Sequence, residues 1–443
     1  MKIKNRDKPL RTERSGDPPG YLSRLIAARA FRRVLRERRQ IDEAIGLETA
    51  QYALSQADVS LVRAILTVSF RRLGSLRAAM ASRAASGEIA DAGLLQPVLV
   101  TALAQVLFLD VPDHASVDCA VEIAKRDADA KHYASFANAL LRRVAAEKAD
   151  ILIEFTGKQN DTPAWLFDRW AMFYGADVAS LIAAAHLVEP PVDLTVFHDI
   201  SPDISGVELP TGSFRLKTHQ SISSLPGYAE GLFQVQDVAA ALPARLAGAK
   251  PGMRIADLCA APGGKTAQLA AAGAHVVAVE RSAARAARLR ENLARLKLEA
   301  DIQIGDATEF TGVPFDAVLL DAPCSATGTI RRHPEIAWTK TLADILALAS
   351  QQLRMLEAAS RLVKPGGLLV FSTCSLELEE GEDQISRFLD QNPDFRRLPI
   401  ALGESDIPAE MITPRGDLRA LPCHLAEWGG ADGFFAARLQ RIA

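Results

Sequence analysis

Cysteine is scarce in this chain of 443 residues, and its placement excludes several kinds of site. The five cysteines are Cys119, Cys259, Cys324, Cys374 and Cys423, and no two of them form a C-x-x-C pair. A zinc site or a disulfide framework is therefore not expected, and no metal is predicted. Cysteines that need no disulfide partner suit a reducing cytoplasm, which is the expected location.

Long apolar runs are missing as well. Hydrophobic residues make up 49% of the chain, yet no stretch approaches the roughly 20 uninterrupted apolar residues that a membrane helix requires. The charged N-terminus, MKIKNRDKPLRTERSGDPPG, has no apolar segment behind it, so we do not expect a secretory signal. The sequence predicts a soluble protein without a membrane partner, and a monomer is the expected form.

The charge of the chain is unevenly distributed. The net charge is -3, but residues 1–39 hold 13 Lys or Arg and four acidic residues, an excess of nine positive charges. Such a segment is either a solvated tail and helix face or a contact for phosphates. Clustered cations gain affinity for nucleic acid by releasing counterions, which favours the second interpretation.

Four segments are expected along the chain. Residues 1–20 resemble a flexible basic arm, and residues 21–146 show apolar spacing typical of a helical bundle, as in Leu94 to Leu107. Residues 160–245 mix helical and short strand-like pieces and are interpreted as a small connector subdomain. From residue 246 to residue 443, apolar strands alternate with longer helical stretches, which predicts a parallel sheet with helices on both faces. The expected strands are 254–258, 275–279, 301–304, 317–320 and 368–371.

Acidic residues and a glycine turn stand where these strands end, which is where ligands bind in such sheets. The stretch DLCAAPGGKT runs from Asp257 to Thr266, and Glu280, Asp306 and Asp321 follow later strands. A pyrophosphate would prefer G-x-G-x-x-G and fewer carboxylates. Carboxylates suit ribose hydroxyls and an exocyclic amine, and the glycine loop suits an amino-acid tail. Each feature alone is commonly a turn or a helix cap, but together they favour S-adenosylmethionine.

Two cysteines follow strands that are expected to be neighbours. Cys324 lies in DAPCSATG and Cys374 in FSTCSLELEEGE, so both thiols should face one cleft. A lone cysteine is commonly a small buried side chain. The pair, with the carboxylate of Asp321 beside it, instead suggests covalent chemistry on an electron-poor ring, in which one thiolate adds and a second group later removes a proton.

The set of motifs resembles the RsmB type of the RsmB/Nol1/Nsun family of RNA cytosine-5 methyltransferases. The matching stretches are DLCAAPGGKT, DAPCSATGTIRRHPEI, FSTCSLELEEGE and DGFFAARL. The first 146 residues resemble a NusB-type RNA-binding module through ASVDCAVEIAKR and NALLRRV, and PAWLFDRW and QVQDVAA resemble the connector. The resemblance implies a NusB-like all-α bundle, a mixed connector, and an α/β Rossmann-like class I methyltransferase domain.

The resemblance also implies roles for individual residues. Cys374 would be the nucleophile, Cys324 would assist product release, and Asp321 would orient the base at nitrogen 3. The cofactor would be S-adenosylmethionine and the partner RNA, with 16S ribosomal RNA expected. Glu280 stands where the family more often has Asp, and Cys423 in LPCH has no assigned role. The expected cofactor contacts are Cys259, Ala260, Ala261, Pro262, Gly263, Gly264, Lys265, Glu280, Asp306 and Asp321.

RNA contacts and rival functions stay open at this point. Arg331, Arg332 and His333 follow Cys324 and are placed for RNA phosphates, although an exposed charged loop would look the same. A DNA cytosine methyltransferase would use the cysteine of the Pro-Cys pair as its nucleophile, and a small-molecule methyltransferase would not need the basic arm. A tRNA cytosine-5 methyltransferase and a non-catalytic RNA-binding assembly factor on the same fold are further alternatives.

Overall fold

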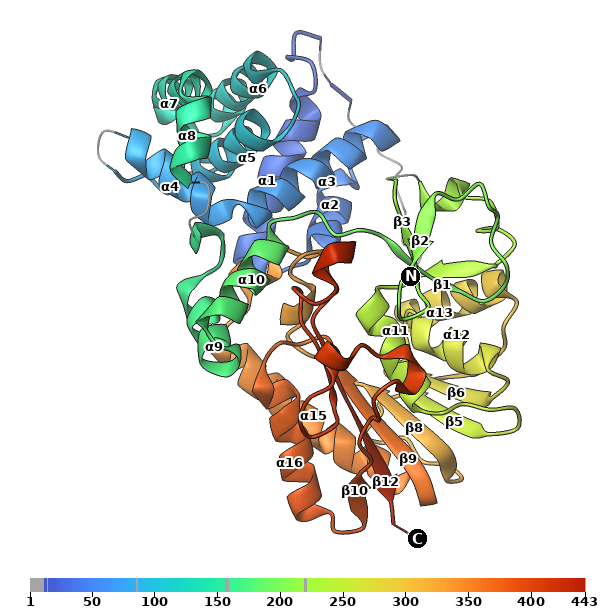
Figure 1. Ribbon diagram of the computed structural model, residues 1–443. Coiled ribbons are helices and arrows are strands. Elements are labelled where there is room, and N and C mark those ends of the chain that lie inside the picture. Colours follow the sequence, from blue (N-terminus) through green and yellow to red (C-terminus); the bar gives the residue numbers. More distant parts are fainter. Residues whose placement is uncertain (1–11, 14, 85–86, 156–158, 219–220, 443) are drawn as a thin grey trace, which may run out of the picture. The chain divides into compact units, whose positions relative to one another are not determined.

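The computed structural model describes the chain in five stretches, residues 12–13, 15–84, 87–155, 159–218 and 221–442. The chain forms two compact units (Figure 1). The first comprises residues 1–169 and 333–340, and the second comprises residues 170–332 and 341–443. Most of the predicted basic arm, residues 1–11 and Arg14, lies outside the described residues.

The first unit is a helical bundle around one apolar core. Helix α5 lies at its centre, because almost every side chain of α5 is buried, on all of its faces. Helix α3 begins at a capping box in which the Ser55 and Asp58 side chains bind each other's backbone N–H. The helices are α1 (Tyr21–Glu37), α2 (Ile41–Thr49), α3 (Gln56–Arg71), α4 (Leu73–Arg83), α5 (Leu95–Phe108), α6 (Asp113–Arg126), α7 (Ala134–Ala146) and α8 (Lys148–Phe155).

A short segment from the second half of the chain completes this helical unit. Residues His333–Lys340, which include the four-residue helix α14 (Ile336–Thr339), belong to it. The indole Nε1 of Trp338 donates to the carbonyl of Phe70 at 2.9 Å. The buried carboxylate of Glu335 accepts from the backbone N–H of Ile41 at 3.1 Å, at the start of α2. Residues that follow the Cys324 motif are thus part of the helical core.

The connector begins with two helices, α9 (Ala164–Tyr174) and α10 (Ala176–His186). A four-stranded antiparallel sheet in the order β2-β3-β1-β4 and helix α11 (Val238–Leu246) follow. The connector was predicted over residues 160–245, and residues 170–245 belong to the same compact unit as the sheet that follows them. The strands are β1 (Asp193–Val196), β2 (Gly206–Glu208), β3 (Phe214–Leu216) and β4 (Phe233–Val235).

The second unit is built on an eight-stranded sheet in the order β10-β12-β9-β8-β5-β6-β7, with β11 paired to β12. The strands from β9 to β7 in this order are parallel, and β10, β11 and β12 add an antiparallel part. The strands are β5 (Arg254–Leu258), β6 (His275–Glu280), β7 (Asp301–Ile304), β8 (Phe315–Asp321), β9 (Val363–Thr373), β10 (Phe395–Arg397), β11 (Leu418–Ala420) and β12 (Phe434–Arg441).

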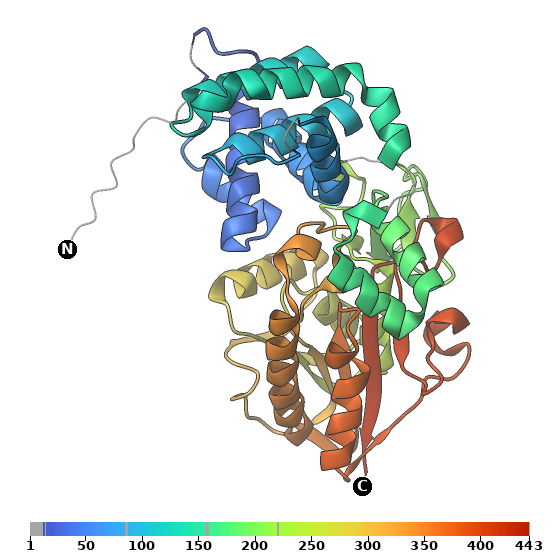
Figure 2. The same cartoon turned by 90° about the vertical axis from the view of Figure 1, so that its left-hand side faces the viewer.

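Helices cover both faces of this sheet, as Figures 1 and 2 show. Helices α11, α12 (Gly264–Ala271) and α13 (Ala283–Leu296) pack on one face. Helices α15 (Leu342–Arg361) and α16 (Glu382–Gln391) pack on the other. The central parallel strands are buried on both faces, which explains their continuous apolar sequences. The predicted fold class is confirmed, and the antiparallel strands β10 to β12 are an addition to it.

Candidate active site

The loop after β5 approaches the site with its backbone. Cys259 has a φ of +65°, and Gly263 has a φ of +106° immediately before α12. A Cβ atom at Gly263 would lie 2.3 Å from Cδ1 of Leu289, so a larger residue does not fit. The glycine therefore allows α12 to pack closely on α13 while the loop of residues 259–265 stays open to a ligand.

Two predicted carboxylates lie at the ends of β6 and β7. Glu280 is 3% exposed and accepts from the backbone N–H of Ser282 at 2.9 Å. Asp306 accepts from the backbone N–H of Thr308 at 2.9 Å and from its hydroxyl at 2.7 Å, which lowers the pKa of Asp306. Both side chains are fixed by local hydrogen bonds, so they are preorganised as acceptors for hydroxyl or amine donors.

Asp321 at the end of β8 lies between two partners. Its carboxylate accepts from Lys265 Nζ at 2.8 Å and from the hydroxyl of Ser372 at 2.9 Å. Nearby, the side chain of Asp257 is buried, and burial raises its pKa to about 7. Burial and the neighbouring carboxylates also raise the pKa of the Cys259 thiol, to about 12. The Cys259 thiol therefore stays uncharged and lines the site without acting as a nucleophile.

A cavity of about 500 Å³ joins these groups. Its lining includes Glu280, Asp306, Asp321 and both cysteines of the predicted pair, Cys324 and Cys374. The volume lies within the range of cavities that bind small molecules and cofactors. The structure thus brings the expected cofactor carboxylates and the expected reactive thiols to one place.

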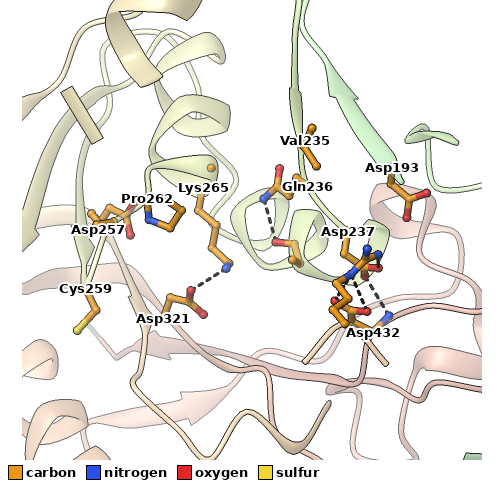
Figure 3. A pocket seen from close by; sticks show the side chains of 15 residues that line it. Asp193, Val235, Gln236, Asp237, Asp257, Cys259, Pro262, Lys265, Asp321 and Asp432 are labelled. Carbon is orange, nitrogen blue, oxygen red and sulfur yellow. Dashed lines mark hydrogen bonds and ion pairs between the residues drawn. The ribbon is translucent and has the colours of Figure 1, made fainter. Parts of the chain in front are cut away.

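A second cavity, of about 280 Å³, adjoins the first at Cys259, Ala261 and Asp321. Figure 3 shows Lys265 facing Asp321 on one side of it and Asp237 gathered with Asp432 on the other. Among the described residues, the Oδ1 atom of Asp257 in its wall is buried and has no hydrogen-bond partner. A buried acceptor without a donor fits a ligand that brings an amine, as an amino-acid tail does.

The two thiols of the predicted pair face each other. Cys324 follows β8 and Cys374 follows β9, and these neighbouring parallel strands are in register at Asp321 and Ser372. The backbone N–H of Gly328 donates to the carbonyl of Cys374 at 3.0 Å, which holds the two loops together. The Sγ atoms are 3.4 Å apart, within the range of a thiol hydrogen bond.

The surroundings of Cys324 determine whether its thiol is protonated. The hydrogen bond to Cys374 and burial raise the pKa of the Cys324 thiol well above its ordinary value, and the nearby carboxylate of Glu380 adds to the effect. Cys324 therefore keeps its proton, and either sulfur atom could be the donor in the hydrogen bond between them.

The three residues expected to contact RNA differ in their exposure and in their partners. Arg331 is 2% exposed and pairs with Asp432 at 3.0 Å. Arg332 pairs with Asp432 and with Asp237, at 2.9 and 2.7 Å. These guanidinium groups bind carboxylates inside the protein, and their contact with RNA phosphates stays a prediction. His333 is half-exposed and belongs to the helical unit.

Several residues around the site were not singled out from the sequence. Asp237 and Asp432 line the second cavity, and the ring of Phe434 lies 4.9 Å from Lys265 Nζ. Phe434 belongs to DGFFAARL, so the motif was seen without its contact. Glu380 was one acid among several in LELEEGE, and nothing in the sequence distinguishes it. Cys423 does not line either cavity, and no role follows for it.

Among the helices of the described stretches, none is long and apolar enough to cross a bilayer. Within the same stretches, His, Cys, Asp and Glu side chains do not gather in threes in a way that could hold a metal ion.

The cavity is lined by carboxylates, and its glycine turn lacks a G-x-G-x-x-G repeat. These features suit a cationic ligand with hydroxyl and amine groups better than a dinucleotide. Among Rossmann-like sheets, that combination defines the methyltransferases that depend on S-adenosylmethionine, and the second unit is of this class. Comparison with known proteins is more specific. Residues 245–440 match the family "16S rRNA methyltransferase RsmB/F", and residues 22–146 match the NusB family.

The chain belongs to the RsmB/F family, because its relatives match it over most of its length. It is 35% identical to ribosomal RNA small subunit methyltransferase B of Pseudomonas syringae pv. tomato, over 95% of this chain and 97% of that one. The protein of the same name from Pasteurella multocida is 35% identical over 78% of this chain and 80% of that one. The resemblance drawn from the motifs is therefore confirmed.

Solved structures agree on the fold. A methyltransferase homologue from Pyrococcus horikoshii is 29% identical, with a TM-score of 0.53 over 66% of this chain and 98% of that chain. The crystal structure of PH0851 is 23% identical, with a TM-score of 0.74 over 98% of this chain and 100% of that chain. At that identity the second likeness concerns the fold alone.

Proposed function

We propose that this enzyme transfers a methyl group from S-adenosylmethionine to carbon 5 of a cytosine in 16S ribosomal RNA, in the cytoplasm. The observation that carries the proposal is the pair of thiols, 3.4 Å apart, in the wall of the cavity that holds the cofactor carboxylates. A methyltransferase acting on a nucleophilic oxygen or nitrogen needs no such pair. Carbon 5 of cytosine is a weak nucleophile and has to be activated by addition at carbon 6.

The cofactor would be held by the residues predicted for it. The carboxylate of Glu280 would take the ribose hydroxyls, and Asp306 would take the exocyclic amine. The loop from Cys259 to Lys265 would face the amino-acid tail, with Asp257 as a further acceptor. When bound, S-adenosylmethionine supplies an electrophilic methyl group on a sulfonium. The protein's part is to orient it and to exclude water.

The thiols would then act in sequence on a cytosine that has been unstacked from the RNA. The Cys374 thiolate would form a bond to carbon 6, Asp321 would orient the ring, and carbon 5 would take the methyl group. Cys374 would then be a neutral thioether, so the hydrogen bond between the two sulfur atoms, which raises the pKa of Cys324, would be weakened. Cys324 can release its proton to water, take the proton from carbon 5, and let Cys374 leave as a thiolate. One proton is released overall.

RNA recognition is proposed for the helical unit. Its match to the NusB family and the excess of positive charge in residues 1–39 support a role in binding phosphates. Arg331, Arg332 and His333 stay predicted RNA contacts, and the first two also pair with carboxylates of the protein. A monomer remains the expected form, and the four predicted segments remain the proposed functional division of the chain.

Bisulfite sequencing of ribosomal and transfer RNA, from cells with and without the gene, tests the substrate. A protected cytosine in 16S ribosomal RNA that disappears with the gene is the expected result. A site that disappears from transfer RNA instead would identify the alternative substrate. If no cytosine changes in either RNA, the enzyme is not a cytosine-5 methyltransferase of these molecules, and a non-catalytic role in ribosome assembly becomes the better explanation.

A further inference from the structure

A buried carboxylate that does not line the cavity binds the residue that follows each of the two thiols. Glu380 is 0% exposed. Its Oε1 atom accepts from the backbone N–H of Ser325 at 2.9 Å and from the side-chain amide of Gln352 at 3.0 Å. Its Oε2 atom accepts from the hydroxyl of Ser375 at 2.6 Å and from that of Ser325.

The two serines that Glu380 binds are the sequence neighbours of the two cysteines. Ser325 immediately follows Cys324, and Ser375 immediately follows Cys374. The two hydroxyls are also 3.2 Å from each other, so one carboxylate oxygen holds both loops at a single point. The loops leave different strands, and 50 residues of chain separate their thiols.

We propose that Glu380 is a positioning residue that sets the separation of the Cys324 and Cys374 thiols by binding the serine after each of them. This inference rests on the proposed function for its catalytic meaning, because the two thiols have to act on adjacent carbons of one ring. The geometric part, that the carboxylate fixes the distance between the sulfur atoms, stands without it.

The chemistry of the contacts supports this role. Hydrogen bonds to an ionised carboxylate are roughly twice as strong as neutral ones and impose a shorter, better defined geometry. Gln352 of α15 adds a third tether, which anchors Glu380 to a helix packed on the sheet. Reactive groups on loops need such support, because a displacement of about 1 Å can reduce a rate roughly 100-fold.

Glu377 provides a matched control. It is also 0% exposed and lies three residues before Glu380. Its carboxylate accepts from the indole Nε1 of Trp170 at 3.2 Å instead of from the serines. Glu377→Gln should therefore report the general cost of changing a buried glutamate in this region without releasing the two cysteine loops.

The first measurement is the rate at which dibromobimane, a short reagent that fluoresces after joining two thiols, bridges Cys324 and Cys374 in the full-length protein without RNA. The Cys324→Ala protein gives the background from other cysteines. Glu380→Gln keeps the shape of the side chain but presents an amide donor or a neutral oxygen to the serines. We expect bridging to slow roughly 10- to 100-fold in Glu380→Gln and to stay at the wild-type rate in Glu377→Gln.

The second measurement is methylation of RNA, with cofactor affinity determined by calorimetry. Glu380→Gln should lower kcat by a similar factor and leave the Kd for S-adenosylmethionine unchanged, since Glu380 does not line the cavity. If Glu380→Gln folds poorly, Ser325→Ala and Ser375→Ala each remove one tether and should each slow bridging. Restoring the charge with Glu380→Asp should recover part of the loss relative to Glu380→Gln.

Two results would overturn the proposal and leave Glu380 a structural residue. In the first, Glu380→Gln bridges its thiols and methylates RNA at the wild-type rates. In the second, Glu380→Gln and Glu377→Gln show equal losses. The bridging measurement uses neither RNA nor cofactor. A wild-type protein that bridges quickly but methylates no cytosine would therefore refute the proposed function, whereas slow bridging in Glu380→Gln would still support the positioning role.

Discussion

Replacing Cys324 by alanine should trap the enzyme on its RNA. The substitution removes the thiol that lies 3.4 Å from the Cys374 sulfur and leaves Cys374 itself in place. Addition to carbon 6 and methyl transfer need only Cys374, so both should still occur. Elimination needs a base for the proton on carbon 5, and a positioned base contributes typically about 10²- to 10⁴-fold to a rate. The lifetime of the covalent intermediate should lengthen by about that factor.

The assay is denaturing gel electrophoresis of the protein after incubation with RNA and S-adenosylmethionine. A covalent adduct survives denaturation and migrates more slowly than the free protein. We expect an adduct that accumulates in Cys324→Ala, no adduct and no methylation in Cys374→Ala, and no adduct in the double variant. The double variant is the control for non-specific cross-linking, because it retains Cys119, Cys259 and Cys423.

Two other outcomes would refute the assignment. An adduct in Cys374→Ala but not in Cys324→Ala would reverse the roles of the thiols, as the mechanism of DNA cytosine methyltransferases predicts. No adduct in any variant, with stability losses of about 1–3 kcal/mol as the main effect, would mean that both cysteines are structural.

Three further predictions concern the cofactor, the helical unit and the arm. Glu280→Ala should weaken S-adenosylmethionine binding about 10- to 100-fold by calorimetry, since a hydrogen bond to a charged group contributes roughly 1.5–3 kcal/mol. As a control, Glu299→Ala at an exposed position should have no effect. Unchanged affinity in Glu280→Ala would refute the assignment of Glu280 to the ribose. Burial raises the pKa of Glu335 to about 7, above the roughly 4.3 of an unfolded chain, so the folded state binds more protons between these values and stability should fall as pH rises from about 4 to about 7. Glu335→Gln should remove that fall and be more stable than the wild type at pH 8 by up to about 3 kcal/mol in chemical denaturation; equal stability would mean that Glu335 is not buried as a carboxyl. Replacing four of the six cations of the arm by serine should weaken RNA binding and reduce its salt slope by roughly 3, because each phosphate that the arm neutralises adds about 0.7 to the slope. Anisotropy titrations at several salt concentrations with an unchanged slope would exclude these cations from the interface. These cations are Lys2, Lys4, Arg6 and Lys8.

The parts of the structure that were predictable from the sequence depend on local patterns. The strand at residues 254–258 and the helix expected over 282–298 are observed as Arg254–Leu258 and Ala283–Leu296, because apolar periodicity and turns delimit them. The position of Cys324 beside Cys374 was also predictable, because ligand-binding groups gather where neighbouring parallel strands end.

The parts that were missed depend on contacts between residues far apart in the chain. Arg331 looks like an exposed cation in its own segment, and its partner Asp432 lies about 100 residues later. Strand β12 pairs antiparallel with β9 across more than 60 residues, which apolar periodicity does not specify. Glu380 acts on Ser325 over 55 residues. Local sequence predicts which elements form, but the partner of each buried charge is decided by their packing.

The segment His333–Lys340 determines how a role of the helical unit in RNA binding should be tested. Deleting residues 1–150 would remove the charged arm, but it would also remove Phe70 and Ile41, the partners of Trp338 and Glu335. Trp338 and Glu335 lie in the stretch of chain that follows the loop of Cys324. The deletion would therefore expose the indole of Trp338 and the buried carboxylate of Glu335. A loss of methylation after such a deletion would not separate weaker RNA binding from damage to the catalytic loop. Charge substitutions in the arm leave both contacts intact, and any change in salt dependence that they cause can therefore be assigned to phosphate binding alone.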